Sequence, residues 1–458
     1  MNERQKENLQ NKIREWIDAH REELIHDLKE LISIPSVSVP QENSEEPYGH
    51  ACRQALEYMT AKGESIGLKA VGKDAGCVQL LWEGRDGKEH PSLGIWAHLD
   101  VVPAGDGWHY SPFAATEHDG YLVGRGCGDD KGPAIGILYA VRCLKELGVQ
   151  LSYPVMLGYG TSEENGMHAL EAWLQSHKPP DYNLVADCGF PVCYAEMGSL
   201  QVRFRTPRKD SDGWLQAGDV VNMIPSLARW ECGETSLEAS GRSAHVAAPG
   251  MSVNALHELA VKVLESGKTG SVSNLWEFAE RMTRDGYGRA AGIACRDDLS
   301  GPLVGQVTLA RTTKDCFVLE ADYRYPVFSR EKISDGEDLI PRLQETAEAY
   351  GMEMEVAANS LPAYCPKEST LVKELMRCYH ELTDSDTEPF VMSGGTYAKI
   401  LPNAVTYGGT IEHKKIYRED GWPDGVGDYH QSDESLRLEE LLEAVYIWSA
   451  TLADLELA

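Results

Sequence analysis

The chain has 458 residues, more than one hydrophobic core usually supports, so we expect two domains. Apolar residues make up 42% and charged residues 25%, a balance that argues against extensive disorder. The formal net charge is −29, from 43 basic and 72 acidic residues, and without a basic stripe such a chain repels nucleic acid.

The first part of the chain predicts helices that alternate with strands. Apolar residues recur at helical spacing from Gln10 to Ile34, and Pro35 ends that pattern. The next predicted elements are a helix at 51–66, a strand at 92–102, a helix at 133–147, a strand at 153–159, a helix at 166–176 and a strand at 183–187. This alternation is typical of an α/β fold with a mostly parallel sheet and helices on both faces.

Between residues 190 and 366 the pattern changes to short strands, turn clusters and two helical segments, near 256–263 and 340–350. We interpret this stretch as an inserted α+β lid domain. From residue 371 the α/β pattern returns, with a helix, the glycine turn SGGT, a strand at 404–409 and a final helix at 435–455. The predicted catalytic domain is therefore discontinuous, at 1–189 and 367–458, with the lid domain at 190–366.

Cysteine usage and the N-terminal segment indicate a reducing compartment. The 11 cysteines form no C-x-x-C pair, and Cys143 and Cys188 lie in apolar runs, as buried free thiols do. The segment MNERQKENLQNKIREW is charged throughout, and no apolar run reaches the length of a membrane span. We therefore predict a cytoplasmic protein without a membrane partner.

Polar residues follow the predicted strands at their carboxyl ends, where ligands of parallel sheets bind. His98 and Asp100 lie two apart, so both face one side and the carboxylate can accept a hydrogen bond from the imidazole, although an H-x-D pair also arises by coincidence. Asp187 ends another strand, and His430 precedes the last helix. Two imidazoles among carboxylates suit zinc better than magnesium.

Two acidic motifs add candidates for metal binding. In GRGCGDDKG, residues 124–132, the glycines permit a tight path that presents Asp129 at a helix entrance; alternatively, Asp129 or Asp130 caps that helix. Glu163 and Glu164 are adjacent after a strand, so one can bind a metal while the other acts on water. The alternative for the glutamates is a solvated acidic turn.

Together these segments carry a family resemblance. WAHLDVVP, GRGCGDDKG, TSEENG, SGGTY and the late His430 resemble, in order, the co-catalytic zinc metallopeptidase family of aminoacylases, glutamate carboxypeptidases and PepV-type bacterial dipeptidases, the PepV type most of all. The resemblance implies a zinc-exopeptidase-like catalytic domain with two Zn²⁺, or Mn²⁺ or Co²⁺ in their place. The ligands it implies are Asp129 as the bridge, His98 and Asp187 at one metal, and Glu164 and His430 at the other. It also implies that Asp100 orients His98 and that Glu163 is the general base.

The resemblance extends into the predicted lid domain. GRSAHVAAP, VVNMIP and DYRYP resemble segments that bind substrate and the oxyanion, which implies a catalytic role for His245 and substrate binding by Asn222 and Arg324. Arg324 would receive the substrate's terminal carboxylate together with Ser393 and Gly394, unless it is a structural strand arginine. The length of the insert resembles the enlarged lid of PepV-like members, which implies a monomer.

The predicted function is metal-dependent hydrolysis of a dipeptide or a closely related amide. A water bridging two zinc ions would attack, and Glu163 would act as general base. An N-acyl-amino-acid deacylase or a carboxypeptidase with the same metal centre is the alternative hydrolase. A non-catalytic binding protein is a more remote alternative, because such a protein would lack Glu163 or a ligand and here every position is filled.

Overall fold

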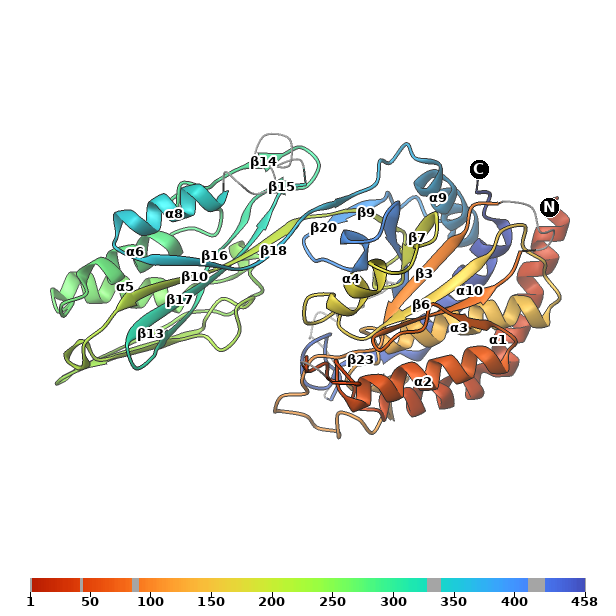
Figure 1. Ribbon diagram of the computed structural model, residues 1–458, viewed down its shortest axis with the longest axis horizontal. Helices are drawn as coiled ribbons and strands as arrows, with labels where there is room; N and C mark the ends of the chain where they lie inside the picture. The colour runs from red at the N-terminus through yellow and green to blue at the C-terminus, as the bar shows by residue number, and fades with distance from the viewer. Residues whose placement is uncertain (1, 42–43, 85–89, 328–338, 411–424, 458) are drawn as a thin grey trace. The chain divides into compact units, whose positions relative to one another are not determined.

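The computed structural model describes residues 2–41, 44–84, 90–327, 339–410 and 425–457 (Figure 1). The chain divides into two compact units. Unit 1 comprises Met1–Tyr194, Tyr364–Phe390 and Thr396–Ala458, and unit 2 comprises Ala195–Ala363 and Val391–Gly395. The glycine turn with Ser393 and Gly394 therefore belongs to unit 2, although the sequence analysis assigned it to the catalytic domain.

A nine-stranded sheet forms the centre of unit 1. Its spatial order is β1 (Lys69–Val71), β2 (Cys77–Trp82), β6 (Val155–Gly160), β3 (Leu93–His98), β7 (Tyr182–Val185), β21 (Ala404–Tyr407), β9 (Val192–Glu196) and β19 (Ala363–Tyr364), with β20 (Phe390–Met392) paired to β9. The four strands β6, β3, β7 and β21 are parallel neighbours. By contrast, β1 with β2, β2 with β6, and β21 with β9 pair antiparallel.

The predicted α/β class is confirmed, and the sheet is mixed. The parallel pairs named above join the four neighbouring strands β6, β3, β7 and β21. The short connection between Val71 and Cys77 explains one antiparallel pair, because a crossover to a parallel neighbour needs a dozen or more residues. β3 is buried along its whole length, as expected for a parallel strand covered on both faces.

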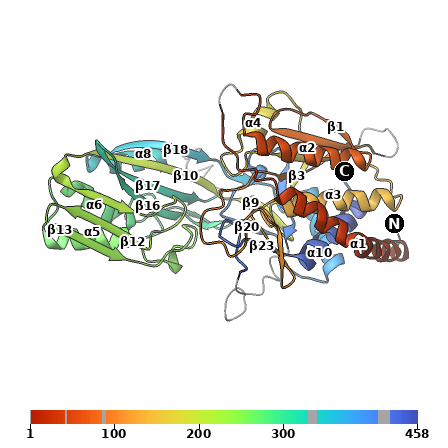
Figure 2. The same cartoon turned by 90° about the horizontal axis from the view of Figure 1, so that it is seen from below.

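Helices cover both faces of this sheet, as predicted (Figure 1 and Figure 2). The helices of unit 1 are α1 (Glu3–Ile32), α2 (His50–Ser65), α3 (Lys131–Glu146), α4 (His168–Leu174), α9 (Thr370–Thr383) and α10 (Leu438–Asp454). On one face, the Trp96 ring packs edge-on against Trp173 of α4, with ring centroids 5.5 Å apart. On the other face, the Tyr159 hydroxyl donates to the carbonyl of Ala134 in α3, at 3.2 Å. The sheet is thus the middle layer of three.

Helix α1 begins earlier than its apolar spacing predicts. Asn2 and Gln5 form a capping box at its start, which satisfies main-chain N–H groups in a stretch that is otherwise charged. Its C-terminal end is bound by α3, because the buried Lys131 ammonium donates to the carbonyls of Leu31 at 3.1 Å and Ile34 at 2.6 Å. Burial lowers the pKa of Lys131 to about 7. These contacts fix α1 next to the GRGCGDDKG segment.

Unit 2 contains a seven-stranded sheet that is antiparallel in every described pairing. Its order is β13 (Thr235–Ser240), β12 (Leu227–Cys232), β11 (Trp214–Ala217), β16 (Val304–Thr312), β17 (Cys316–Tyr325), β10 (Gly198–Pro207) and β18 (Glu353–Ser360). The helices α5 (Ala255–Ser266), α6 (Ser273–Thr283) and α8 (Leu339–Ala349) share a core with the sheet, in which the Trp230 and Trp276 rings lie 5.2 Å apart. Sequence patterning indicated α5 and α8 but not α6.

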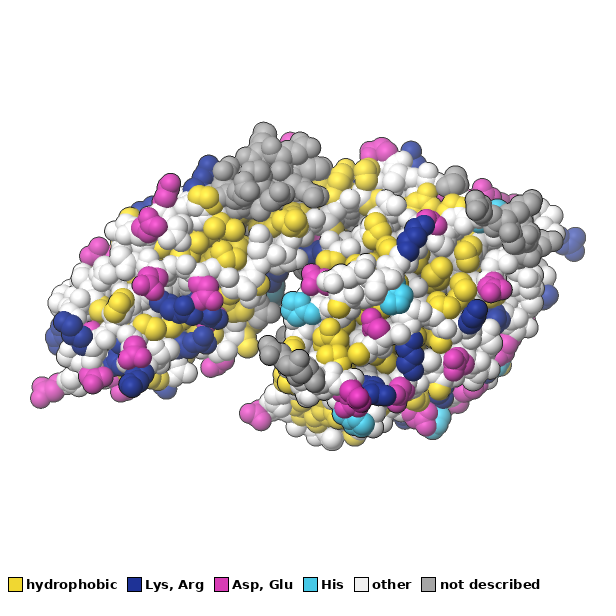
Figure 3. Space-filling view, viewed as in Figure 1, with side chains coloured by type: hydrophobic (Ala, Val, Ile, Leu, Met, Phe, Trp, Pro, Cys, Tyr) yellow, Lys and Arg dark blue, Asp and Glu magenta, His cyan; other side chains and the backbone are white. Residues whose placement is uncertain are grey.

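The other face of the sheet in unit 2 is charged. Cross-strand ion pairs lie on it, such as Arg229 with Glu238 at 2.6 Å and Arg205 with Glu355 at 2.7 Å. Figure 3 shows basic and acidic side chains interspersed over the part of this unit that is in view. Exposed pairs of this kind contribute little stability and keep the face solvated.

Short strands complete the described structure. β4 (Thr116–His118), β5 (Tyr121–Val123) and β23 (Ser435–Arg437) form a three-stranded sheet, β8 (Cys188–Gly189) pairs with β22 (Gly409–Thr410), and β14 (Arg296–Asp297) pairs with β15 (Gly301–Pro302). None of the helices in the described ranges combines the length and apolar composition that a membrane crossing requires.

Asp454 joins three helices of unit 1 and allows a test of this packing. Its carboxylate accepts hydrogen bonds from Lys6 of α1 at 2.7 Å and Arg377 of α9 at 2.8 Å. Burial alone would raise the pKa of Asp454, but the bonds to Lys6 and Arg377 outweigh burial and lower it. A carboxylate whose folded pKa is lowered stabilises the fold above its unfolded pKa, and that contribution is lost as pH falls.

We therefore expect Asp454→Asn to lower the free energy of unfolding of unit 1 by about 1–2 kcal/mol at pH 7. The difference from wild type should persist down to about pH 4, the carboxyl's unfolded pKa, and narrow only as pH falls further, toward the lower folded pKa. Urea unfolding from pH 7 down to about pH 3 measures both effects. Asp18→Asn, on the exposed face of α1, is the matched control and should change little. Equal midpoints for Asp454→Asn and wild type at pH 7 would contradict the prediction.

Candidate metal centre

The predicted ligands of unit 1 meet at one edge of its sheet. His98 is the last residue of β3, and Asp187 follows the end of β7, its parallel neighbour. Glu163 and Glu164 lie in the turn after β6, the parallel neighbour on the other side. Parallel strands end at the same edge, so these side chains converge there.

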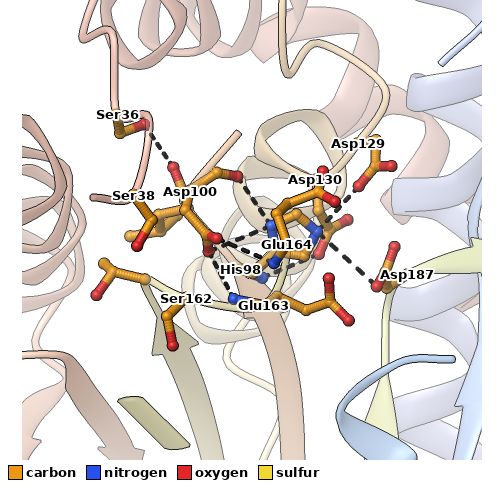
Figure 4. Close-up of polar contacts among 12 residues, drawn as sticks. Ser36, Ser38, His98, Asp100, Asp129, Asp130, Ser162, Glu163, Glu164 and Asp187 are labelled. Carbon is orange, nitrogen blue, oxygen red and sulfur yellow. Dashed lines mark hydrogen bonds and ion pairs between the residues drawn. The ribbon is translucent and has the colours of Figure 1, made fainter. Parts of the chain in front are cut away.

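The carboxylate of Asp129 lies between two imidazoles. Its Oδ1 is 2.9 Å from Nε2 of His98, and its Oδ2 is 3.0 Å from Nε2 of His430. His98 Nε2 also lies 3.8 Å from Asp187 Oδ2, and His430 Nε2 lies 2.9 Å from Glu164 Oε1. Five side chains from distant parts of the sequence thus form one continuous cluster, part of which Figure 4 shows.

The donor atoms of this cluster fit two metal ions. They form two groups, each with ligand atoms within 4.8 Å of one another, and Asp129 belongs to both. The groups are His98, Asp129 and Asp187, and Asp129, Glu164 and His430. Each group offers one imidazole nitrogen and carboxylate oxygens, the mixture that zinc accepts and that the all-oxygen preference of magnesium disfavours.

The negative charges gathered in the cluster also favour the binding of cations. Burial alone would lower the pKa of His430, but hydrogen bonds to Asp129 and Glu164 outweigh burial and raise it to about 11. Burial raises the pKa of Asp187, and the nearby negative charge of Asp129 raises it further. Protons or metal ions must therefore balance the carboxylates that gather here.

Asp100 holds the cluster in a different way from the one its spacing predicts. The carbonyl oxygen of Asp100, not its carboxylate, accepts the hydrogen bond from Nδ1 of His98, at 2.9 Å. The carboxylate oxygen Oδ1 lies farther away, at 3.6 Å. Because a carbonyl only accepts, Nδ1 carries the proton and the lone pair of Nε2 is left for a metal. The predicted orienting role thus falls to the main chain.

The Asp100 carboxylate instead fixes the two glutamates. Its two oxygens accept the main-chain N–H groups of Glu163 at 3.0 Å and Glu164 at 3.1 Å (Figure 4). Asp100 is fully buried, and burial raises its pKa to about 6. The turn that carries both glutamates is therefore anchored, unlike the solvated acidic turn of the alternative interpretation.

The two adjacent glutamates differ in their partners. The Glu164 carboxylate binds His430, whereas within the described residues the Glu163 carboxylate has neither a hydrogen bond nor an ion pair. Figure 4 shows the Glu163 carboxylate on the same side as Asp187. Burial raises the pKa of Glu163 well above the usual value, and the charge of Asp187 adds to this.

Sequence reasoning missed three charged residues that support the cluster. Asp130 is the N-cap residue that precedes α3, but its side chain makes no capping hydrogen bond, contrary to the capping alternative. It accepts the main-chain N–H of His98 instead, at 3.1 Å. Arg125 and Glu434 form a buried pair beside Asp129. Asp130 and Arg125 lie within GRGCGDDKG, and Glu434 lies four residues after His430. The burial that distinguishes them depends on tertiary contacts, so no local signal could have identified their roles.

The predicted substrate residues of the lid domain lie in unit 2. Met223 forms an isolated bridge with His245, and the N–H of Val246 donates to the carbonyl of Asn222 at 2.9 Å, so Asn222 and His245 are close. Arg324 lies in β17 and donates to Asp322 at 2.8 Å. This contact is also expected if Arg324 is a structural arginine of the strand. Ser393 and Gly394 belong to the segment of unit 2 that follows β20.

Comparisons with known proteins agree with this geometry. Residues 94–454 match the model of peptidase family M20/M25/M40. A protein of Staphylococcus saprophyticus named "Putative dipeptidase" is 27% identical over 96% of this chain and 98% of its own length. The structure of human carnosine dipeptidase 1 matches with a TM-score of 0.63 and 16% identity, over 97% of this chain and 98% of that chain.

A Bacillus subtilis structure described as a dinuclear metal-binding peptidase of the M20 family matches with a TM-score of 0.53 and 16% identity, over 96% of this chain and 100% of that chain. At such identities these structures establish a shared fold. The family match covers most of the chain and both ligand groups. The chain belongs to peptidase family M20/M25/M40 and is a metallopeptidase.

Proposed function

We propose that the chain is a dipeptidase with two zinc ions, for which Mn²⁺ or Co²⁺ can substitute. Asp129 would bridge the ions, with His98 and Asp187 at one and Glu164 and His430 at the other. The observation that carries the proposal is the position of Asp129, whose two carboxylate oxygens face the two imidazoles. A single carboxylate shared by two ligand groups is the arrangement that a bridged pair of ions needs.

Glu163 is the proposed general base. Zinc held by these ligands would supply Lewis acidity, which polarises a substrate carbonyl and makes water easier to deprotonate. Glu163 would accept a proton from the attacking water and return it to the leaving amine. Its carboxylate is suited to this task because no described residue engages it, while Asp100 holds its main chain in place. Glu164, the neighbour, is engaged by His430 and suits a ligand role.

A dipeptide is the proposed substrate. Hydrolysis of a peptide follows from the family, and the relative from Staphylococcus saprophyticus that spans nearly the whole chain bears the name "Putative dipeptidase". An N-acyl-amino-acid deacylase or a carboxypeptidase would split the same kind of bond with the same ligands and remains the alternative. A non-catalytic protein is disfavoured by the presence of Glu163 together with a complete ligand set.

Further assignments are proposed from the resemblance. His245 would stabilise the oxyanion, while Asn222, Arg324, Ser393 and Gly394 would bind substrate. The proximity of His245 and Asn222 within unit 2 supports a shared task for these two residues. We also propose a functional monomer in the cytoplasm.

A substrate panel tests the dipeptidase assignment. Unblocked dipeptides, N-acetylated amino acids and longer peptides should be compared by kcat/KM in enzyme reconstituted with zinc or manganese. We expect dipeptides to be preferred by at least about 10-fold, because the site should recognise a free amine as well as a carboxylate. A preference for acylated amino acids would establish the deacylase instead. Treatment with a strong chelator should abolish turnover of every substrate, and full activity after it would rule out the metal assignment.

Substitution of the adjacent glutamates separates their roles. Glu163→Gln should retain two metals and lose about 10²–10⁴-fold in kcat, because an amide cannot accept the proton of water. Glu164→Gln should instead bind less metal and recover part of its activity when metal is added. Elemental analysis beside kcat, over a range of added zinc, measures both. The exposed Glu171→Gln is the matched control, and metal loss in Glu163→Gln alone would reverse the assignment.

His245→Ala tests the assignment in unit 2. We expect kcat to fall by about 10²–10³-fold, the effect of losing one oxyanion donor, while metal content stays unchanged. His257→Gln, a substitution at another histidine of unit 2, should leave kcat near the wild-type value and controls for general damage to the unit. An unchanged kcat in His245→Ala would show that this side chain takes no part in the reaction.

A further inference from the structure

A buried ion pair lies directly beside the proposed bridging ligand. Nη1 of Arg125 is 2.6 Å from Oε2 of Glu434, and the two side chains are 1% and 0% exposed. The second terminal nitrogen of Arg125 donates to the carbonyls of Pro103 at 3.5 Å and Ala104 at 3.3 Å. The guanidinium also lies 5.2 Å from the centre of the Trp108 ring. Arg125 is therefore held from several sides, and it holds Glu434 in turn.

The carboxylate oxygen of Glu434 that does not face Arg125 binds the main chain next to the Asp129 side chain. Oε1 accepts the N–H groups of Gly128 at 3.2 Å and Asp129 at 3.3 Å. The carbonyl of Glu434 accepts the N–H of Gly124 at 2.8 Å, at the other end of the same segment. One residue thus fixes both ends of the stretch from which the Asp129 side chain extends.

The turn that carries His430 is closed by the residues on either side of Glu434. The N–H of Gly427 donates to the carbonyl of Asp433 at 2.6 Å, and the N–H of Ser435 donates to the carbonyl of Gly427 at 3.1 Å, so that Gly427 and Glu434 are paired in an isolated parallel bridge. His430 lies within this turn with φ of 61°, a left-handed conformation that a non-glycine residue adopts only when its surroundings hold it. The two segments that supply Asp129 and His430 therefore meet at Glu434.

We propose that Glu434, neutralised by Arg125, is a positioning residue that sets Asp129 between the two imidazoles. The inference rests on the proposed metal ligands. It assigns a role to Glu434, which belongs to neither of the two ligand groups. Replacing a buried ion pair with well-packed apolar residues is often neutral or stabilising, so stability alone gives little reason for this pair. A carboxylate here provides an acceptor for two N–H groups. Arg125 cancels a negative charge that would otherwise repel Asp129.

Two double variants isolate the acceptor from the ion pair. Arg125→Met/Glu434→Gln and Arg125→Met/Glu434→Leu both remove the two charges, but only the first retains an oxygen for the N–H groups of Gly128 and Asp129. We expect the Gln variant to bind Zn²⁺ within about 3-fold of wild type and the Leu variant about 10–100-fold more weakly, the usual effect of losing a residue that supports a ligand. Competition with a chromophoric chelator measures the affinities. Thermal unfolding of the metal-free proteins shows whether both variants fold equally well.

A third variant covers the case in which the Leu variant does not fold. Glu434→Asp keeps the charge and Arg125, but its shorter side chain withdraws the acceptor from Gly128 and Asp129. It should weaken Zn²⁺ binding by about 10-fold, with an unfolding midpoint near that of wild type. Wild-type affinity in Glu434→Asp, or equal affinities in the two double variants, would overturn the inference.

Asp129→Asn distinguishes failure of the positioning role from failure of the proposed function. If this variant retains both metals, the ligand assignment itself is wrong, whatever the Glu434 variants do. If Asp129→Asn loses metal while every Glu434 variant binds as wild type, the ligand assignment stands and only the positioning role fails.

Discussion

The site depends on a single carboxylate held between two imidazoles. Asp129 Oδ1 and Oδ2 lie 2.9 and 3.0 Å from the Nε2 atoms of His98 and His430, so a small displacement of this side chain would change both ligand groups at once. A ligand shared by two ions cannot adapt to one of them without disturbing the other. Much of the surrounding structure serves to keep the main chain of residues 124–130 in place.

The architecture of the sheet explains why the proposed ligands come from its centre. β6, β3, β7 and β21 are parallel neighbours, and the C-terminal ends of the first three of these strands, with the residues just after them, supply Glu164, His98 and Asp187. The outer pair β1 and β2 is antiparallel, so neighbouring strand ends there point to opposite edges and cannot combine their side chains. The mixed sheet therefore concentrates the functional groups at the middle of one edge.

Sequence patterning predicted the residues whose positions follow from the local order of strands and turns. It failed for residues whose roles depend on contacts between distant parts of the chain. His98 and Asp187 could be identified because an apolar run followed by a polar residue is typical of the end of a buried parallel strand. The role of Glu434 could not, because its partner Arg125 is 309 positions away and the chain has 72 acidic residues among which burial cannot be recognised. The role of Asp100 was placed on the wrong atoms, since spacing along a strand fixes the face of a side chain but not which oxygen meets an imidazole.

The carboxylates of the site fall into groups according to what they bind. This grouping distinguishes the carboxylates that hold the main chain in place from those that can bind a metal or exchange a proton. Asp100, Asp130 and Glu434 are fully buried, and each accepts main-chain N–H groups, so their charges hold the backbone in place. Asp129 and Glu164 face imidazole nitrogens at hydrogen-bond distance, a position that a metal ion can enter. Among the residues that the structure describes, the Glu163 carboxylate makes neither kind of contact, although its main chain is fixed by Asp100. A carboxylate that is anchored through its backbone and left without a side-chain partner can exchange a proton without disturbing the fold, which is the property that a general base requires.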